Sequence, residues 1–170
     1  EASRNLAAVM ADPPEGLNLA RPQYSLAEAK YNLGLKKEAL ADYENSLKAD
    51  ATGELSGAAW FGVAWAKKDL GDSKGALEAA AKVINDYPES AVRPDSFALT
   101  ASIRRSEGDA AGALADLDRL LSEYPGHALS AKAELERASA LDETGSHAEA
   151  AEAFQKFLRD HPDHADVPQA

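Results

Sequence analysis

The stretch GDSKGALEAAAKVINDYP at residues 71–88 is followed, 37 residues later, by GDAAGALADLDRLLSEYP at residues 108–125. The two segments share a glycine at the start, an alanine five residues on and a proline at the end. A fixed period of this length indicates a repeat architecture. The same columns recur at a step of 37 residues at Gly34, Gly71, Gly108 and Gly145, at Ala39, Ala76, Ala113 and Ala150, and at Pro88, Pro125 and Pro162.

Each column has a physical role in a pair of helices. Glycine adopts positive φ without steric cost, so it suits the turn where one helix ends and the chain reverses. Asp72 and Asp109, directly after two of the glycines, are typical first residues of a new helix. The alanine lets the two helices cross closely, and apolar residues follow it at helical spacing. Proline ends the second helix. We therefore predict a helix, a glycine turn, a second helix and a proline stop in every repeat.

These columns resemble the tetratricopeptide repeat, whose pattern is W-x2-L-G-x2-Y, then A-x3-F, then P. The resemblance covers essentially the whole chain and implies an all-α fold, a right-handed α-solenoid of antiparallel helix pairs. The period is longer than the ~34 residues typical of the family. In addition, Lys30, Lys67 and Arg104 replace the tyrosine of the first helix. In the second repeat the matching positions are Trp60, Val63, Ala64, Gly71, Ala76 and Pro88.

The register divides the chain into four whole repeats with a fragment at each end. Residues 1–14 are predicted to be the second helix of a preceding repeat, and residues 163–170 the start of a following repeat or a tail. We therefore expect the chain to be a segment of a longer array. The four predicted repeats span residues 15–51, 52–88, 89–125 and 126–162.

The junctions between repeats indicate a particular branch of the family. DYPES at residues 86–90 and EYPGH at residues 123–127 resemble a bacterial cell-envelope branch of the family. That branch includes the Tol–Pal-associated coordinator protein and the lipoprotein subunit of the outer-membrane β-barrel assembly machinery. The resemblance implies a non-enzymatic adaptor in the periplasm or cell envelope, with the cytoplasm as the alternative.

Composition restricts the classes of partner. The chain has 170 residues, a formal net charge of −11 and no cysteine. Such a charge disfavours contact with phosphate backbones, so we expect no nucleic-acid partner. The absence of cysteine excludes disulfides, thiolate zinc sites and a thiol nucleophile. No run of about 18 apolar residues is present, so we expect no direct insertion into a membrane.

No motif indicates catalysis, a cofactor or a metal. The turn glycines are spread one per repeat instead of forming a phosphate-binding loop. His161 and His164 flank a proline, which favours a solvated loop over a metal site. We therefore predict a protein that is not an enzyme, without cofactor or metal.

The resemblance also suggests a binding surface, because in this family the first helix of each repeat lines a concave groove that receives a peptide. Tyr24, Tyr31, Phe61 and Trp65 stand out, since exposed aromatic residues are typical anchors for a partner. The alternative is that these aromatics only pack between neighbouring helices. The predicted partner-binding residues are Tyr24, Glu28, Tyr31, Asn32, Phe61, Trp65, Lys68, Ser102 and Arg105.

A second candidate is a basic ladder formed by Lys30, Lys67 and Arg104, which recur at 37 residues in an acidic chain. Such cations could hold an acidic peptide or a C-terminal carboxylate. The alternative, which we favour, is that each cation interacts with the end of its helix and with a nearby Asp or Glu. The carboxylate clamp of chaperone-binding relatives is not reproduced, because its positions hold Tyr24, Phe61, Ala98 and Leu135.

The sequence thus predicts a scaffold that binds a partner peptide or protein in its concave groove. Two alternatives stay open. One is a structural array that assembles with copies of itself, and the other is an accessory region of a larger enzyme.

Overall fold

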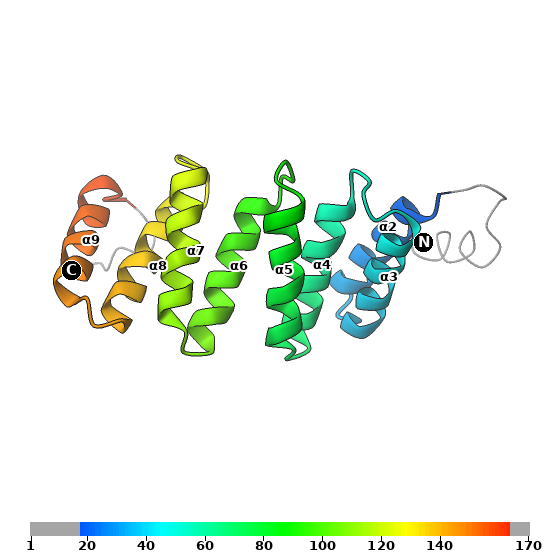
Figure 1. Ribbon diagram of the computed structural model, residues 1–170, viewed down its shortest axis with the longest axis horizontal. Helices are drawn as coiled ribbons and strands as arrows, with labels where there is room; N and C mark the ends of the chain where they lie inside the picture. The colour runs from blue at the N-terminus through cyan, green and yellow to red at the C-terminus, as the bar shows by residue number, and fades with distance from the viewer. Residues whose placement is uncertain (1–17, 164–170) are drawn as a thin grey trace. The chain divides into compact units, whose positions relative to one another are not determined.

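The computed structural model describes residues 18–163, and this range is helical with no strand. The predicted helix at 1–14 and the tail from 164 lie outside the described residues. Figure 1 shows the helices in chain order. They are α2 (Ala20–Asn32), α3 (Lys36–Ala49), α4 (Ser56–Asp69), α5 (Ser73–Asp86), α6 (Arg93–Ser106), α7 (Ala110–Glu123), α8 (Ser130–Glu143) and α9 (His147–Asp160).

The helices fall into two compact units, with the division between Ser96 and Phe97 in α6. In unit 1, α2 packs on α3, α3 on α4 and α4 on α5 (Figure 1). In unit 2, α7 packs on α8 and α8 on α9. Within each unit these helices are therefore packed chiefly against their neighbours in the chain, as expected for a repeat architecture.

The turn after each first helix is built around the repeated glycine. Gly34, Gly71, Gly108 and Gly145 have φ values of 79°, 82°, 82° and 84°. At Gly71, the glycine N–H donates to the carbonyl of Lys68, and the next N–H, of Asp72, donates to the carbonyl of Lys67. These two bonds form the Schellman motif, which satisfies carbonyls left free at a helix end. The predicted requirement for positive φ is confirmed.

The second helices begin and end as predicted from the sequence. Asp72 accepts a hydrogen bond from the backbone N–H of Gly75 at 2.9 Å, and Asp109 accepts the equivalent bond from Gly112. At the other end, the helix stops at Asp86, and Tyr87 leaves the helical region before Pro88, with φ −127° and ψ 64°. The residue before a proline avoids the helical region because the proline ring would clash with it. The pair Tyr124–Pro125 does the same after α7.

The core follows the alanine column and the apolar stripe behind it. Ala39, Ala76 and Ala113 are fully buried, so nothing separates the two helices of a repeat at their crossing. The next stripe position, four residues on, holds Tyr43 in the first repeat and Leu117 in the third, both with 1% exposure or less. A buried tyrosine brings a hydroxyl group into the core, and that hydroxyl defines the site described next.

Candidate functional site

Unit 1 contains a cleft of about 510 Å³ between its two first helices, α2 and α4. Six of the nine residues predicted to bind a partner line it. The remaining lining comes from α3, from α4 and from the segment before α6. The described residues that line the cleft are Tyr24, Glu28, Tyr31, Asn32, Tyr43, Ala58, Phe61, Gly62, Trp65 and Val92.

The floor of the cleft depends on a contact between Tyr43 of α3 and Gly62 of α4. A Cβ atom placed on Gly62 would lie 2.4 Å from ring carbons of Tyr43. Only glycine therefore lets the tyrosine ring lie directly against the backbone of α4. The cost of a glycine inside a helix, about 1 kcal/mol relative to alanine, is offset here by the packing of a large aromatic ring.

A carboxylate, Glu28, lines the cleft together with three tyrosines. The hydroxyl of Tyr43 donates a hydrogen bond to Glu28 Oε1. Burial raises the pKa of Tyr43 above its ordinary value, and the Glu28 carboxylate raises it further. Burial and Glu28 likewise raise the pKa of Tyr24. Both tyrosines therefore stay protonated, and Glu28 is the one residue with a formal charge among the described residues that line the cleft.

The walls of the cleft are aromatic. The rings of Phe61 and Trp65, one turn apart on α4, stand edge to face with centroids 6.2 Å apart and planes at 88°. Opposite them, Tyr24 is tilted against Tyr43 with centroids 5.9 Å apart. Phe61, Trp65 and Tyr24 are half-buried. The ammonium group of Lys68 lies over the Trp65 ring, 4.7 Å from its centroid.

One end of the cleft is closed by Tyr31. Its hydroxyl donates to Asp69 Oδ2 at 2.8 Å, which joins α2 to the end of α4. Lys36 lies over the Tyr31 ring, with Nζ 3.2 Å from the ring centroid and 3.1 Å from Asp69 Oδ2. Burial and the hydrogen bond to Asp69 raise the pKa of Tyr31 above its ordinary value. Although burial acts in the opposite direction, the hydrogen bonds from Tyr31 and Lys36 lower the pKa of Asp69.

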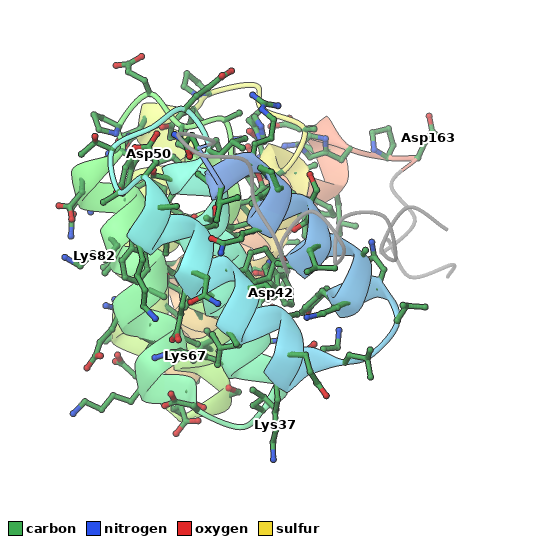
Figure 2. The ribbon with its side chains drawn as sticks, turned by 90° about the vertical axis from the view of Figure 1, so that its right-hand side faces the viewer. Lys37, Asp42, Asp50, Lys67, Lys82 and Asp163 are labelled. Carbon is green, nitrogen blue, oxygen red and sulfur yellow. The ribbon has the colours of Figure 1, made fainter. Side chains whose placement is uncertain are left out.

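The first two cations of the basic ladder lie in unit 1 and are paired within their own repeats. Lys30 Nζ is 2.5 Å from Asp42 Oδ2, and Lys67 Nζ is 3.8 Å from Asp72 Oδ2. Figure 2 shows Asp42 within unit 1, midway along α3, while Lys37 and Asp50 lie towards its two ends. Lys30 and Lys67 therefore each have a partner in the second helix of the repeat or at its start, as in the alternative interpretation of the ladder.

The third cation, Arg104, is paired with the buried Asp116 of α7. Its Nη1 lies 3.2 Å from Asp116 Oδ2 and donates to the carbonyl of Gly112 at 3.0 Å. Burial raises the pKa of Asp116, against the opposing effects of Thr100 and Arg104. Each of the three ladder cations is thus paired within its own repeat, and its contact with a partner stays a prediction.

The comparison with family models decides the architecture. Models of the tetratricopeptide repeat match residues 20–52, 58–90 and 99–165. The chain contains tetratricopeptide repeats.

Solved structures of other tetratricopeptide proteins share this fold. MamA has a TM-score of 0.78 at 20% identity, with 99% of this chain and 85% of that chain covered. A tetratricopeptide repeat protein from Parabacteroides merdae has a TM-score of 0.79 at 18% identity, with 95% and 59% covered. YrrB, described as a TPR protein with an unusual peptide-binding site, has a TM-score of 0.73 at 20% identity, with 96% and 79% covered. The predicted all-α solenoid of helix pairs is thereby confirmed. A search of curated proteins finds no match.

The same pair of repeat positions forms a side-chain contact between consecutive first helices in both units. Tyr31 bonds to Asp69 in unit 1, and two repeats later Arg105 bonds to Glu143 in unit 2. Arg105 Nε donates to Glu143 Oε2 at 3.2 Å and Nη2 lies 2.5 Å from Oε1. Arg105, predicted to bind a partner, is thus paired within the chain. Ser102 is exposed on α6.

Sequence reasoning did not assign Tyr43, Ala58, Gly62 and Val92 to the cleft. Their repeat positions belong to the core or to a junction, so groove positions of the tetratricopeptide family do not include them. A signal was present for two of them. Gly62 is a glycine inside a helical segment, and Tyr43 is a large ring where the second repeat has Ala80. A large residue on one helix opposite a glycine on the next indicates close approach.

Within residues 18–163, no group of three or more His, Cys, Asp or Glu side chains could hold a metal ion. None of the helices in that range is both long enough and apolar enough to cross a membrane.

Proposed function

We propose that the chain is a protein-interaction scaffold and that the cleft of unit 1 holds a segment of a partner protein. The observation that carries this proposal is the set of half-buried aromatic rings, from two first helices, around one open cleft of about 510 Å³. Aromatic residues that are partly exposed in a preformed cleft are typical energetic centres of protein interfaces.

The geometry favours a peptide segment over a small metabolite. The cleft lies between the first helices of two consecutive repeats and is open to solvent, so an extended chain can enter and leave it. YrrB, a structural neighbour, is described as having a peptide-binding site. This supports the proposal without defining where a peptide would lie in the present chain.

A binding role also agrees with the polar groups of the cleft. The Tyr43 hydroxyl donates its hydrogen bond to Glu28, and the Tyr31 hydroxyl donates its hydrogen bond to Asp69. Both hydroxyls donate to carboxylates, but burial and those carboxylates raise the pKa of each tyrosine, so neither hydroxyl readily loses its proton to become a nucleophile. We therefore propose binding rather than catalysis for this cleft.

The finer expectations from the sequence belong to the same proposal. We propose that the chain is part of a longer array and that its junction motifs at 86–90 and 123–127 reflect an adaptor of the bacterial cell envelope. Self-assembly is the competing function. Light scattering over a dilution series separates the two, because an array that assembles with itself gains mass with concentration whereas a scaffold for another protein does not.

The cleft is tested with a displayed library of random 12-residue peptides selected on the whole chain. The double variant Phe61→Ala/Trp65→Ala should bind the selected peptides at least tenfold more weakly, because it removes the aromatic wall that α4 contributes. The matched control is Leu158→Ala, which removes an apolar side chain that is 45% exposed on α9, outside the cleft. Circular dichroism checks that helicity is unchanged. Equal affinity of the double variant and the control would show that the cleft is not the binding site.

A further inference from the structure

We infer that the partner segment inserts a basic side chain, lysine or arginine, into the cleft of unit 1 beside Glu28. The inference rests on the proposed function, because it names the chemistry of the segment that the cleft holds. It also differs from the expectation that a basic ladder binds an acidic peptide.

The charge inside the cleft is the first support. Glu28 is the one charged residue among the described residues that line it. No lysine, arginine or histidine within residues 18–163 forms an ion pair with Glu28, so its carboxylate is available to a cation from outside the chain. Asn32, which also lines the cleft, adds an amide oxygen that can accept a hydrogen bond from an ammonium or guanidinium group.

The aromatic walls are the second support. Phe61 and Trp65 stand at 88° to each other, and Tyr24 lies on the α2 side of the same cleft. The faces of aromatic rings carry negative potential, so a cation that enters the cleft is attracted to an exposed ring face. The chain already shows this preference, since the ammonium of Lys68 rests over the Trp65 ring.

The cleft is less favourable for an acidic or a neutral polar side chain of the partner. The hydroxyls of Tyr43 and Tyr31 are already donated to Glu28 and Asp69, so they offer no hydrogen to an incoming carboxylate. A carboxylate would also lie beside Glu28 without a cation in the lining. A basic side chain meets both the carboxylate and the ring faces.

The cations near the cleft determine how strong this preference is. Lys36 is engaged by Asp69 at 3.1 Å and by the Tyr31 ring. Lys68 has no ion pair with a carboxylate in the part of the chain that the structure describes, and it lies against Trp65. It therefore repels a basic ligand and shields one ring face. Beyond the cleft, the net charge of −11 attracts basic partners over longer distances.

The test uses the peptides selected from the random 12-residue library on the whole chain. Each is synthesised with blocked ends, and its dissociation constant is measured by fluorescence anisotropy. Every lysine or arginine in it is then replaced by glutamine. We expect one basic residue per peptide whose replacement weakens binding roughly tenfold, the size expected for a charge-assisted contact.

Two substitutions in the chain change the cleft in opposite directions. Glu28→Gln keeps the shape of the side chain and removes its charge, and should weaken peptide binding roughly tenfold. Lys68→Met removes the repelling ammonium and should strengthen peptide binding. The matched controls are Glu44→Gln and Lys74→Met, which change the net charge equally at exposed positions outside the cleft. They should leave the affinity within about twofold.

The outcomes separate this inference from the proposed function. Peptides that need Phe61 and Trp65 but contain no essential basic residue, or whose affinity is the same for Glu28→Gln and Glu44→Gln, would overturn the inference and leave the scaffold function intact. Peptides indifferent to Phe61 and Trp65 would overturn both. Basic peptides sensitive to Glu28→Gln, and less tightly bound at high salt, would establish the cation site.

Discussion

Units 1 and 2 contain the same repeat positions with different chemistry. In unit 1 the groove positions of the first helices hold Tyr24, Glu28 and Tyr31 on α2, with Phe61 and Trp65 on α4. Two repeats later, the equivalent positions hold small, polar or aliphatic residues. These are Ala98, Ser102 and Arg105 on α6, with Leu135 and Ser139 on α8.

The difference separates the residues that form the repeated backbone from the residues that form the cleft. The glycine, alanine and proline columns are present in both units, and they produce the same turns and helix ends. The groove positions are not needed for those turns, so they are free to differ. We therefore propose that function is carried by positions that leave the repeated backbone unchanged.

The largest effect is expected at the core position that differs most between the units. Tyr43→Ala should destabilise the fold by about 3–5 kcal/mol and Leu117→Ala by about 2–5 kcal/mol, because both side chains are buried. Only Tyr43→Ala should also abolish peptide capture, since Tyr43 forms the floor of the cleft. Urea unfolding and peptide anisotropy measure the two properties. Loss of capture in a folded Leu117→Ala variant would remove the distinction between the units.

A smaller effect, equal in both units, is expected at the turn glycines. Gly71→Ala and Gly108→Ala should each cost about 1–2 kcal/mol, because both glycines have φ of 82°. A Cβ atom would meet nothing within 4 Å at either position, so the cost comes from the backbone alone. Asparagine tolerates this conformation better than alanine, so Gly71→Asn and Gly108→Asn should cost less. Unequal losses for the two alanine variants would mean that the turns are not equivalent.

The smallest effect is expected at the contacts between consecutive first helices. The double-mutant cycle of Arg105→Gln with Glu143→Gln, and that of Tyr31→Phe with Asp69→Asn, should each give a coupling of about 0.5 kcal/mol at neutral pH. Both pairs are partly exposed, which keeps the energies small.

The same two contacts predict a pH dependence. The hydrogen bond from Arg105 lowers the pKa of Glu143, and the pKa of Asp69 is lowered as well. A lowered pKa in the folded state contributes stability above the unfolded pKa, near 4, and that stability is lost as pH falls through the folded value. Unfolding measured at pH 7 and pH 3 should therefore show both couplings weaken at the lower pH. A coupling of Arg105 and Glu143 that is as strong at pH 3 as at pH 7 would contradict this assignment.

Much of the fold follows from local chemistry and could be predicted. The turns need glycine because of positive φ, the helix starts need Asp72 and Asp109 because of free N–H groups, and the helices end where proline blocks the preceding residue. These requirements involve residues close together in the chain. The site was predicted in part for the same reason, since groove positions follow from the register of the repeat.

The sequence by itself determined the period, the helix pairs and six residues of the cleft. The tertiary structure alone decided how Tyr43 reaches Glu28 past Gly62, because that contact joins three helices and depends on the missing Cβ atom. It also decided that Lys30 pairs with Asp42 and Arg104 with Asp116, partners that the sequence pattern did not predict. A repeat register shows which face a residue occupies, whereas pairing depends on side chains that only packing brings within reach.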